Sequence, residues 1–199
     1  LPVADEDPVF THKQFELFDS IVESIPGRDE KFHVHLSNSA GLLDYHSRTT
    51  NLVRPGLLIY GISPLPAHQE FLRPVMTFKS RVSVINHLPK GHGVSYGRTI
   101  LERDTKAAIL GLGYGDGYPR SLSGKGTSVV LNNSLCPLLG RVTMDQIIVD
   151  VTELDECHPG DEAELFGSNL LVSDLAKKAG TIPWEILTQI TPRVTRVYR

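Results

Sequence analysis

At residues 75–88 the chain reads VMTFKSRVSVINHL. This run is long and rich in β-branched residues, which favours an extended strand. Shorter apolar runs follow it, separated by turn sequences such as Asn132-Asn133 and His158-Pro159-Gly160-Asp161. Short strands at this spacing predict an all-β sandwich or barrel. We expect these strands at 94–101, 107–112, 128–131, 138–142, 146–151 and 162–166.

The end of the chain departs from this pattern of short strands. The apolar spacing predicts two short helices, at 173–179 and 184–189, and Ser173 is the expected cap of the first. A final strand is expected at 194–198.

The residues before the long strand alternate between helical and extended patterns. Apolar residues recur at helical spacing between Pro8 and Pro26-Gly27, which predicts a helix over 8–26. Phe32, Val34 and Leu36 then alternate with histidines, which is typical of a strand. The polar turn 37–41 follows, where a Ser or Asn can cap a second helix and leave backbone N–H groups free for an anion.

A second strand is expected at 51–54, broken by Pro55-Gly56 and continued by the apolar run 57–60. This rhythm is typical of a βα fold. Two units cannot close a barrel, so we expect a small open sheet or the last part of a larger one. The prolines in 61–74 indicate a linker. The chain starts at Leu1 and continues through 2–5 with neither an initiator Met nor a helix cap, which suggests a piece of a longer chain.

Composition limits the class of protein. The 199 residues are 40% hydrophobic and 22% charged, enough for a packed core in one domain or in a part-domain and a small second one. A net charge of −3 argues against a nucleic-acid partner. Two cysteines, Cys136 and Cys157, are too few for a disulfide framework and have no zinc-site spacing, so a reducing, cytoplasmic location is expected. Neither a membrane span nor a signal peptide is indicated.

Three glycine-rich segments are candidates for chemistry. In the segment 90–97, KGHGVSYG, Tyr96 stands before a glycine, where a substrate can approach closely; a structural turn is the competing interpretation. The segment 113–120, GYGDGYPR, reads equally as a hairpin end with an Asp-Gly turn. The segment 140–146, GRVTMDQ, indicates a bulge with a solvent-facing carboxylate.

The polar residues of the first 72 positions have structural interpretations of their own. Arg54 is the most suggestive cation, although a rim salt bridge explains it equally. His35 reads as a satisfied strand histidine, and Asn38 and Ser39 as caps.

Taken together, these motifs resemble the later part of an alanine racemase, the pyridoxal-phosphate enzyme of bacterial wall synthesis. The resemblance extends in order and spacing over nearly the whole chain. It rests on HLSNSA at 35–40, VRPGL at 53–57, VSYG at 94–97, GYGDG at 113–117, GRVTMD at 140–145 and PRV at 192–194.

The resemblance implies a fold of class α/β plus all-β. Residues 1–72 would be the last βα units of a pyridoxal-phosphate-binding (β/α)8 barrel, and residues 73–199 a β-rich C-terminal domain.

It also implies a pyridoxal 5'-phosphate site. Ser39 and the backbone around Asn38, Gly56 and Leu57 would hold the phosphate. Arg54, supported by His35, would face the pyridine nitrogen. An arginine there keeps that nitrogen unprotonated and should disfavour side reactions such as transamination.

The family racemises alanine with two bases, and Tyr96 would be one of them. The Met144 backbone N–H would bind the substrate carboxylate, and Tyr114 would narrow the entrance. In the family the catalytic tyrosine, here Tyr96, comes from the partner subunit. Four residues would therefore act in trans within a head-to-tail homodimer: Tyr96, Tyr114, Met144 and Asp145. No metal, nucleic-acid or membrane partner is implied.

Two departures from the family pattern affect this expectation. The family's Schiff-base lysine lies in a motif of the type VVKANAYGHG, and no such run occurs here. Lys90 in KGHG only resembles its end, so the chain alone is expected to be inactive. Pro192 stands where some members carry a phosphate-contacting tyrosine.

Two alternatives stay open. A serine or broad-specificity racemase would carry the same motifs, because the side chains around the substrate methyl lie mostly outside this segment. A non-catalytic dimerisation or interaction module is the second.

Overall fold

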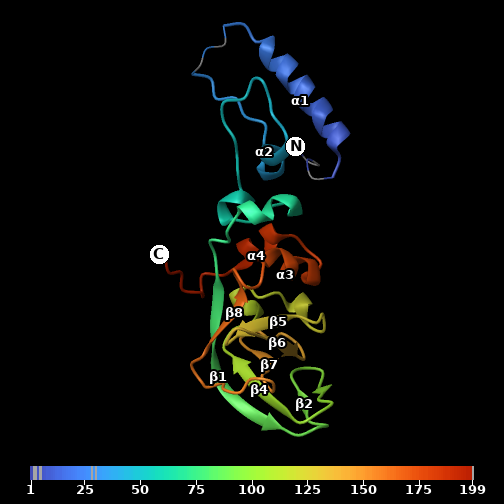
Figure 1. The fold of residues 1–199 in the computed structure, drawn as a ribbon, viewed down its shortest axis with the longest axis vertical. Coiled ribbons are helices and arrows are strands. Elements are labelled where there is room, and N and C mark those ends of the chain that lie inside the picture. Colours follow the sequence, from blue (N-terminus) through green and yellow to red (C-terminus); the bar gives the residue numbers. More distant parts are fainter. Residues whose placement is uncertain (2–3, 5, 28, 30, 199) are drawn as a thin grey trace. The chain divides into compact units, whose positions relative to one another are not determined.

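The computed structural model describes residues 1, 4, 6–27, 29 and 31–198. It divides into two compact units, Leu1–Val75 and Met76–Arg199 (Figure 1). Residues 2, 3 and 5 of the predicted capless start lie outside the described residues. Within the described part of the chain, no helix has the length and apolar character needed to cross a membrane.

The first unit begins with helix α1, Pro8–Glu23, as predicted. Asp7 caps it by accepting the Phe10 N–H over 2.9 Å, and Pro8 stands in the first turn, where its missing N–H costs nothing. The buried residues of the helix recur every three or four positions and so form one face: Thr11, Phe15, Asp19 and Val22.

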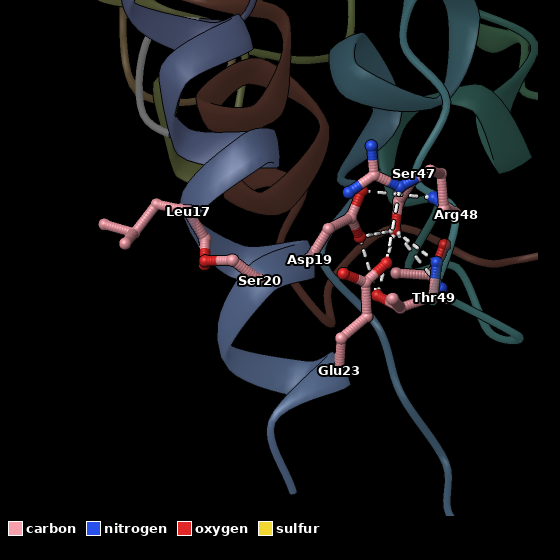
Figure 2. A network of polar contacts seen from close by, with 8 residues as sticks. Leu17, Asp19, Ser20, Glu23, Ser47, Arg48 and Thr49 are labelled. Carbon is pink, nitrogen blue, oxygen red and sulfur yellow. Dashed lines mark hydrogen bonds and ion pairs between the residues drawn. The ribbon is translucent and has the colours of Figure 1, made fainter.

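The buried Asp19 of α1 joins the helix to the loop at residues 47–49 (Figure 2). Its carboxylate accepts the Ser47 and Thr49 hydroxyls, each over 2.6 Å, and the Arg48 N–H over 3.2 Å. Glu23, one turn further along, pairs with the Arg48 guanidinium over 3.4 Å. Burial raises the pKa of Asp19, but the three hydrogen bonds outweigh it and the pKa lies below its ordinary value. The hydrogen bonds of Asp19 and the Glu23–Arg48 ion pair together anchor the loop at residues 47–49, which precedes the second predicted strand.

The two strands predicted in this unit are reduced to one parallel bridge, between His35 and Leu52. Backbone bonds run from Leu52 N to Val34 O and from Arg54 N to Ser37 O, at 3.1 and 3.0 Å, so the register slips by one residue after the bridge. Within the described residues each segment pairs with only one neighbour, and the pairing does not extend into a ladder.

Three further predictions in this unit have different outcomes. Helix α2, Ser39–Asp44, follows the polar turn as expected. The strand predicted at 57–60 was wrong: Leu57–Tyr60 is the 3-10 helix η1, which ends at Gly61 in the left-handed region, φ 70°. The segment 61–74, predicted as a linker, contains a second 3-10 helix, η2, Pro66–Phe71.

The second unit is a closed antiparallel barrel with the strand order β1-β4-β7-β6-β5-β8, which confirms the β-rich prediction (Figure 1). Its strands are β1 Phe78–Leu88, β4 Thr105–Leu110, β5 Ser128–Leu131, β6 Ser134–Leu139, β7 Ile147–Asp150 and β8 Glu162–Phe166. The long strand β1 closes the barrel, because its first part pairs with β8 and its second part with β4, with an irregular register between Val82 and Val84.

The barrel interior is filled by side chains that alternate along short strands. Buried and half-buried residues alternate without a break in β5 and β7. Across the barrel strands, the largest fully buried aliphatic side chains are Leu110, Leu131, Ile147 and Leu165. The barrel interior is thus filled by a packed core, so residues that act on a substrate must lie in the loops.

Several boundaries in this unit differ from the predictions. The predicted strand at 94–101 is a hairpin of β2, Gly93–Val94, and β3, Thr99–Ile100. The strand predicted at 138–142 begins earlier and ends before Gly140, whose φ of 70° takes the chain out of extended geometry. The predicted strand at 194–198 is absent from the described residues there, which form turns and coil.

Both predicted C-terminal helices are present, as α3, Val172–Ala179, and α4, Pro183–Gln189, at one end of the barrel (Figure 1). The predicted cap Ser173 was wrong: the N-cap position is Leu171, and no side chain caps the helix. Gly180 ends α3 in the left-handed region, φ 76°.

Candidate functional site

In the first unit, the predicted anion site lies where the turn 37–41 meets the Pro55-Gly56 turn. Asn38 Oδ1 accepts the Gly41 N–H over 2.9 Å and so caps α2. The buried Ser39 Oγ accepts the N–H groups of Gly56 and Leu58, over 3.0 and 3.4 Å. Ser39 thus joins the start of α2 to the Pro-Gly turn, although the two segments are seventeen residues apart in the chain.

The donors of this turn suit a phosphate. The Ser39 hydroxyl proton stays available, because the oxygen uses only its lone pairs toward Gly56 and Leu58. The first amides of α2 have no acceptor within the helix. Leu57 is 1% exposed and fixes the Pro-Gly turn in the unit's interior. A compact anion could therefore be held by several N–H and O–H groups at once.

Arg54 and His35 come from the two segments that pair side by side. His35 bridges Leu52, and Arg54 lies two residues after Leu52. Both residues are exposed, and Arg54 Nη2 donates to Leu36 O over a long 3.4 Å. Among the described residues no hydrogen bond joins His35 to Arg54. The predicted support of Arg54 by His35 stays a prediction.

In the second unit, Tyr96 stands at the tip of the β2–β3 hairpin and is 73% exposed. The tip is strained: Ser95, Gly97 and Arg98 have φ values of 57°, 80° and 51°. For Ser95 and Arg98, which carry a Cβ, this conformation costs about 1–2 kcal/mol each. Strain of this kind persists only where surrounding contacts impose it, and it clusters at functional sites.

The contact that imposes this turn is with Arg141. Ser95 Oγ donates to the Arg141 carbonyl over 2.7 Å and accepts its N–H over 3.1 Å. A Cβ added to Gly97 would lie 2.8 Å from Arg141 Cζ, so the guanidinium rests against the Gly97 backbone. Both neighbours of Tyr96 are therefore held against the segment 140–145.

The segments 113–117 and 140–145 interlock through their backbones. Tyr114 N donates to Thr143 O over 3.0 Å, and Gly115 N to Met144 O over 2.9 Å. A Cβ at Gly113 would lie 2.1 Å from Thr143 O, so only glycine allows this approach. The Asp-Gly hairpin turn considered from the sequence is instead the 3-10 helix η3, Tyr114–Asp116.

This interlock directs the Met144 amide. In a trans peptide the C=O and N–H groups point in opposite directions. Because Tyr114 binds Thr143 O, the Met144 N–H of the same peptide points away from the 113–117 loop. No acceptor for this N–H is found in the described part of the chain. The Tyr114 and Met144 side chains are 41% and 51% exposed, so the free amide lies in an accessible loop.

Asp145 is exposed, as the sequence suggested, but it is not solitary. Arg193 Nη2 donates to Asp145 Oδ1 over 2.6 Å, and Arg193 Nε lies 3.4 Å from Asp116 Oδ1. Asp116 Oδ2 in turn accepts the Gly113 N–H over 2.9 Å. The hydrogen bond to Asp145 and the charges of both carboxylates raise the pKa of the Arg193 guanidinium.

The structure thus brings the predicted residues into two sets, one in each unit. In the first, Asn38, Ser39, Gly56 and Leu57 adjoin, with Arg54 close by in sequence. In the second, Tyr114, Met144 and Asp145 adjoin. Ser95, Arg141 and Arg193 lie within the quoted motifs VSYG, GRVTMD and PRV, but nothing in the sequence indicated their supporting roles. Each of them acts through a partner at least 46 residues away.

Two protein-family models match the chain, one over most of the first unit and one over the second. The family model of the alanine racemase N-terminal domain matches residues 1–64, and that of the alanine racemase C-terminal domain matches residues 75–198. The chain belongs to the alanine racemase family. The family is one of isomerases, and its two-part fold agrees with the units described above.

An alanine racemase of Vibrio vulnificus is 41% identical over 192 residues, which are 94% of this chain and 52% of that protein. The crystal structure of the racemase from D-cycloserine-producing Streptomyces lavendulae matches with a TM-score of 0.89 at 36% identity. That match covers 100% of this chain and 55% of the other.

The alanine racemase of Bartonella henselae, crystallised with covalently bound pyridoxal phosphate, matches with a TM-score of 0.88 at 31% identity. It covers 98% of this chain and 54% of the other. The chain therefore spans about half the length of the alanine racemases it matches.

Proposed function

We propose that this chain forms the C-terminal half of an alanine racemase that interconverts L- and D-alanine. In this proposal residues 1–72 are the last units of a (β/α)8 barrel and residues 73–199 the β-rich domain. The observation that carries it is the interlock of the 113–117 and 140–145 segments, which leaves the N–H of the exposed residue Met144 without an acceptor among the described residues. The strained hairpin that holds Tyr96 to Arg141 supports a catalytic role over a simple interaction module.

The first unit would hold pyridoxal 5'-phosphate. The Ser39 hydroxyl and the backbone around Asn38, Gly56 and Leu57 have the donor chemistry that a phosphate needs. Arg54, whose guanidinium is exposed and weakly bonded, would contact the ring nitrogen and keep it unprotonated. When bound, the cofactor draws electrons from the substrate α-carbon and so acidifies its α-proton.

The second unit would act on the substrate. Tyr96 takes the α-proton from one face of alanine or returns it there, while a lysine outside this chain serves the other face. The Met144 N–H binds the substrate carboxylate, and Tyr114 narrows the entrance. We further propose a head-to-tail homodimer in which Tyr96, Tyr114, Met144 and Asp145 act in trans.

The location we propose is the cytoplasm. Cys136 and Cys157 are both buried and free, and burial raises the pKa of the Cys136 thiol to about 11. Thiols in this state suit a reducing compartment and play no part in the proposed chemistry.

Racemisation by a defined polypeptide tests this function. We propose that the chain alone is inactive with pyridoxal phosphate and L-alanine, because it contains no cofactor-lysine motif. A fusion enzyme, in which residues 1–199 follow the N-terminal half of the Vibrio vulnificus racemase, should form D-alanine. Sustained turnover by the chain alone would refute the first statement, and a folded, cofactor-loaded fusion without turnover would refute the second.

A further inference from the structure

The Arg193 side chain contacts both of the interlocked segments of the second unit. Its guanidinium contacts Asp116 of one segment and Asp145 of the other, over 3.4 and 2.6 Å. A Cβ placed on Gly115 would lie 2.4 Å from Arg193 Nη1 and 3.0 Å from Met144 O. The arginine therefore packs directly over the contact between Gly115 and Met144.

The charges at this contact favour a fixed arrangement. Asp116 is 14% exposed at its side chain, and its second oxygen already holds the Gly113 N–H. Without the arginine, this half-buried carboxylate would face the Asp145 carboxylate across the interlock with no cation between them. Two carboxylates that contact the same guanidinium repel each other when it is removed, and this repulsion would weaken the contact between the two segments.

The chain around Arg193 is itself anchored to the same loop. Thr191 Oγ1 donates to Gly115 O over 3.0 Å, and Thr191 N donates to Asp116 O over 3.2 Å. Arg193 thus reaches the interlock from a segment that is fixed by backbone bonds. Its position is set before any substrate arrives.

We propose that Arg193 is a positioning residue that aims the Met144 N–H by clamping Asp116 and Asp145. It acts through the two carboxylates and need not touch the substrate. The consequence for carboxylate binding rests on the proposed racemase function, whereas the clamping of the amides does not. Removal of Arg193 should therefore loosen the interlock and weaken substrate binding more than it slows proton transfer.

The first test uses the full chain of 199 residues. Hydrogen exchange of the Tyr114 and Gly115 amides should become about three- to tenfold faster in Arg193→Gln, as expected for the loss of two partly exposed ion pairs. Arg103→Gln is the matched control, because Arg103 also bridges two carboxylates, those of Asp150 and Glu153. Its side chain is 54% exposed, as is that of Arg193, and it precedes β4 at the end opposite Gly113. Unchanged exchange in Arg193→Gln, or equal acceleration in both variants, would overturn the proposal.

The second test uses the fusion enzyme. Arg193→Gln should raise KM for alanine about three- to tenfold and change kcat less than about twofold. Arg103→Gln should change neither constant. A loss of kcat at unchanged KM would overturn the role in substrate binding. If the unsubstituted fusion does not racemise alanine, the proposed function fails, and the exchange measurement still decides the role of Arg193.

Discussion

Tyr114 donates its backbone N–H to the carbonyl of Thr143 over 3.0 Å, and this bond sets the direction of the neighbouring Met144 N–H. A peptide N–H is oriented more firmly than a side-chain donor, because the peptide unit is planar and the hydrogen bond to its C=O fixes the direction of its N–H. Two loops that are nearly thirty residues apart thereby produce one oriented donor.

Gly113→Ala should disrupt this pair of loops. The added Cβ would lie 2.1 Å from Thr143 O and 2.4 Å from Met144 O, both backbone atoms that cannot move independently. We expect the free energy of unfolding to fall by about 2–3 kcal/mol, measured by urea denaturation with Trp184 fluorescence. Gly111→Ala is the control, because its nearest atom is the flexible Ser83 Oγ at 3.3 Å. Equal losses in the two variants would contradict the close-approach explanation.

Ser95→Ala tests the contact that holds the hairpin of Tyr96. The substitution removes both hydrogen bonds to the Arg141 backbone without changing the Tyr96 side chain itself, so the hairpin tip that carries Tyr96 can shift. Because small misplacements of a reacting group are costly, kcat of the fusion enzyme should fall about ten- to a hundredfold. The exposed Ser121→Ala serves as the control. An unchanged kcat would show that the hairpin tip is positioned by other contacts.

The sequence predicted the features that depend on residues close together in the chain better than those that depend on distant residues. Local patterns were sufficient for α1, α2 and most barrel strands, because caps, periodicity and turn residues act within a few positions. The barrel closure by β1 was compatible with the pattern but not determined by it. The register change between Val82 and Val84 depends on strands β4 and β8, far along the chain.

Two of the strand errors lie next to left-handed residues. The strand predicted at 94–101 is interrupted at Ser95, Gly97 and Arg98, and Leu57–Tyr60 forms a 3-10 helix that ends at Gly61. At the site, the motifs were identifiable, but the contacts by which some of their residues support others were not. Arg193 reaches Asp145 across 48 positions, and only the folded barrel brings them together.

Tyr118→Phe should leave the second unit as stable as before or more stable by about 1 kcal/mol. The Tyr118 hydroxyl is fully buried and has no hydrogen-bond partner among the described residues, and its burial raises its pKa. Removing an unsatisfied buried polar group removes its desolvation cost. Thr105→Val, which deletes a bond to Arg103 O over 2.9 Å, should instead cost about 1 kcal/mol. Urea denaturation of both variants checks the contrast, and a loss in Tyr118→Phe would reveal a partner for the hydroxyl.

Asp19 should make the first unit sensitive to acid. Its pKa is lowered in the folded state, so its stabilising effect is complete above the unfolded pKa, near 4, and is lost as the pH falls through the lower folded value. Hydrogen exchange of the α1 amides should therefore accelerate on acidification, after correction for the intrinsic rate. Asp19→Asn should remove most of this dependence, and Glu16→Gln on the exposed face should retain it. Identical profiles for the two variants would contradict the role of Asp19.

The most direct measurement follows the α-hydrogen of alanine in deuterated solvent, in the fusion enzyme with Tyr96→Phe. The enantiomers have equal free energies, so kcat/KM must fall equally in both directions and cannot identify the face that Tyr96 serves. Exchange at the α-carbon can identify it. We predict that racemisation falls by about a hundredfold or more while one enantiomer still exchanges its α-hydrogen with retention of configuration. Equal loss of exchange from both enantiomers, or racemisation at the unsubstituted rate, would contradict the assignment of Tyr96 as one of two bases.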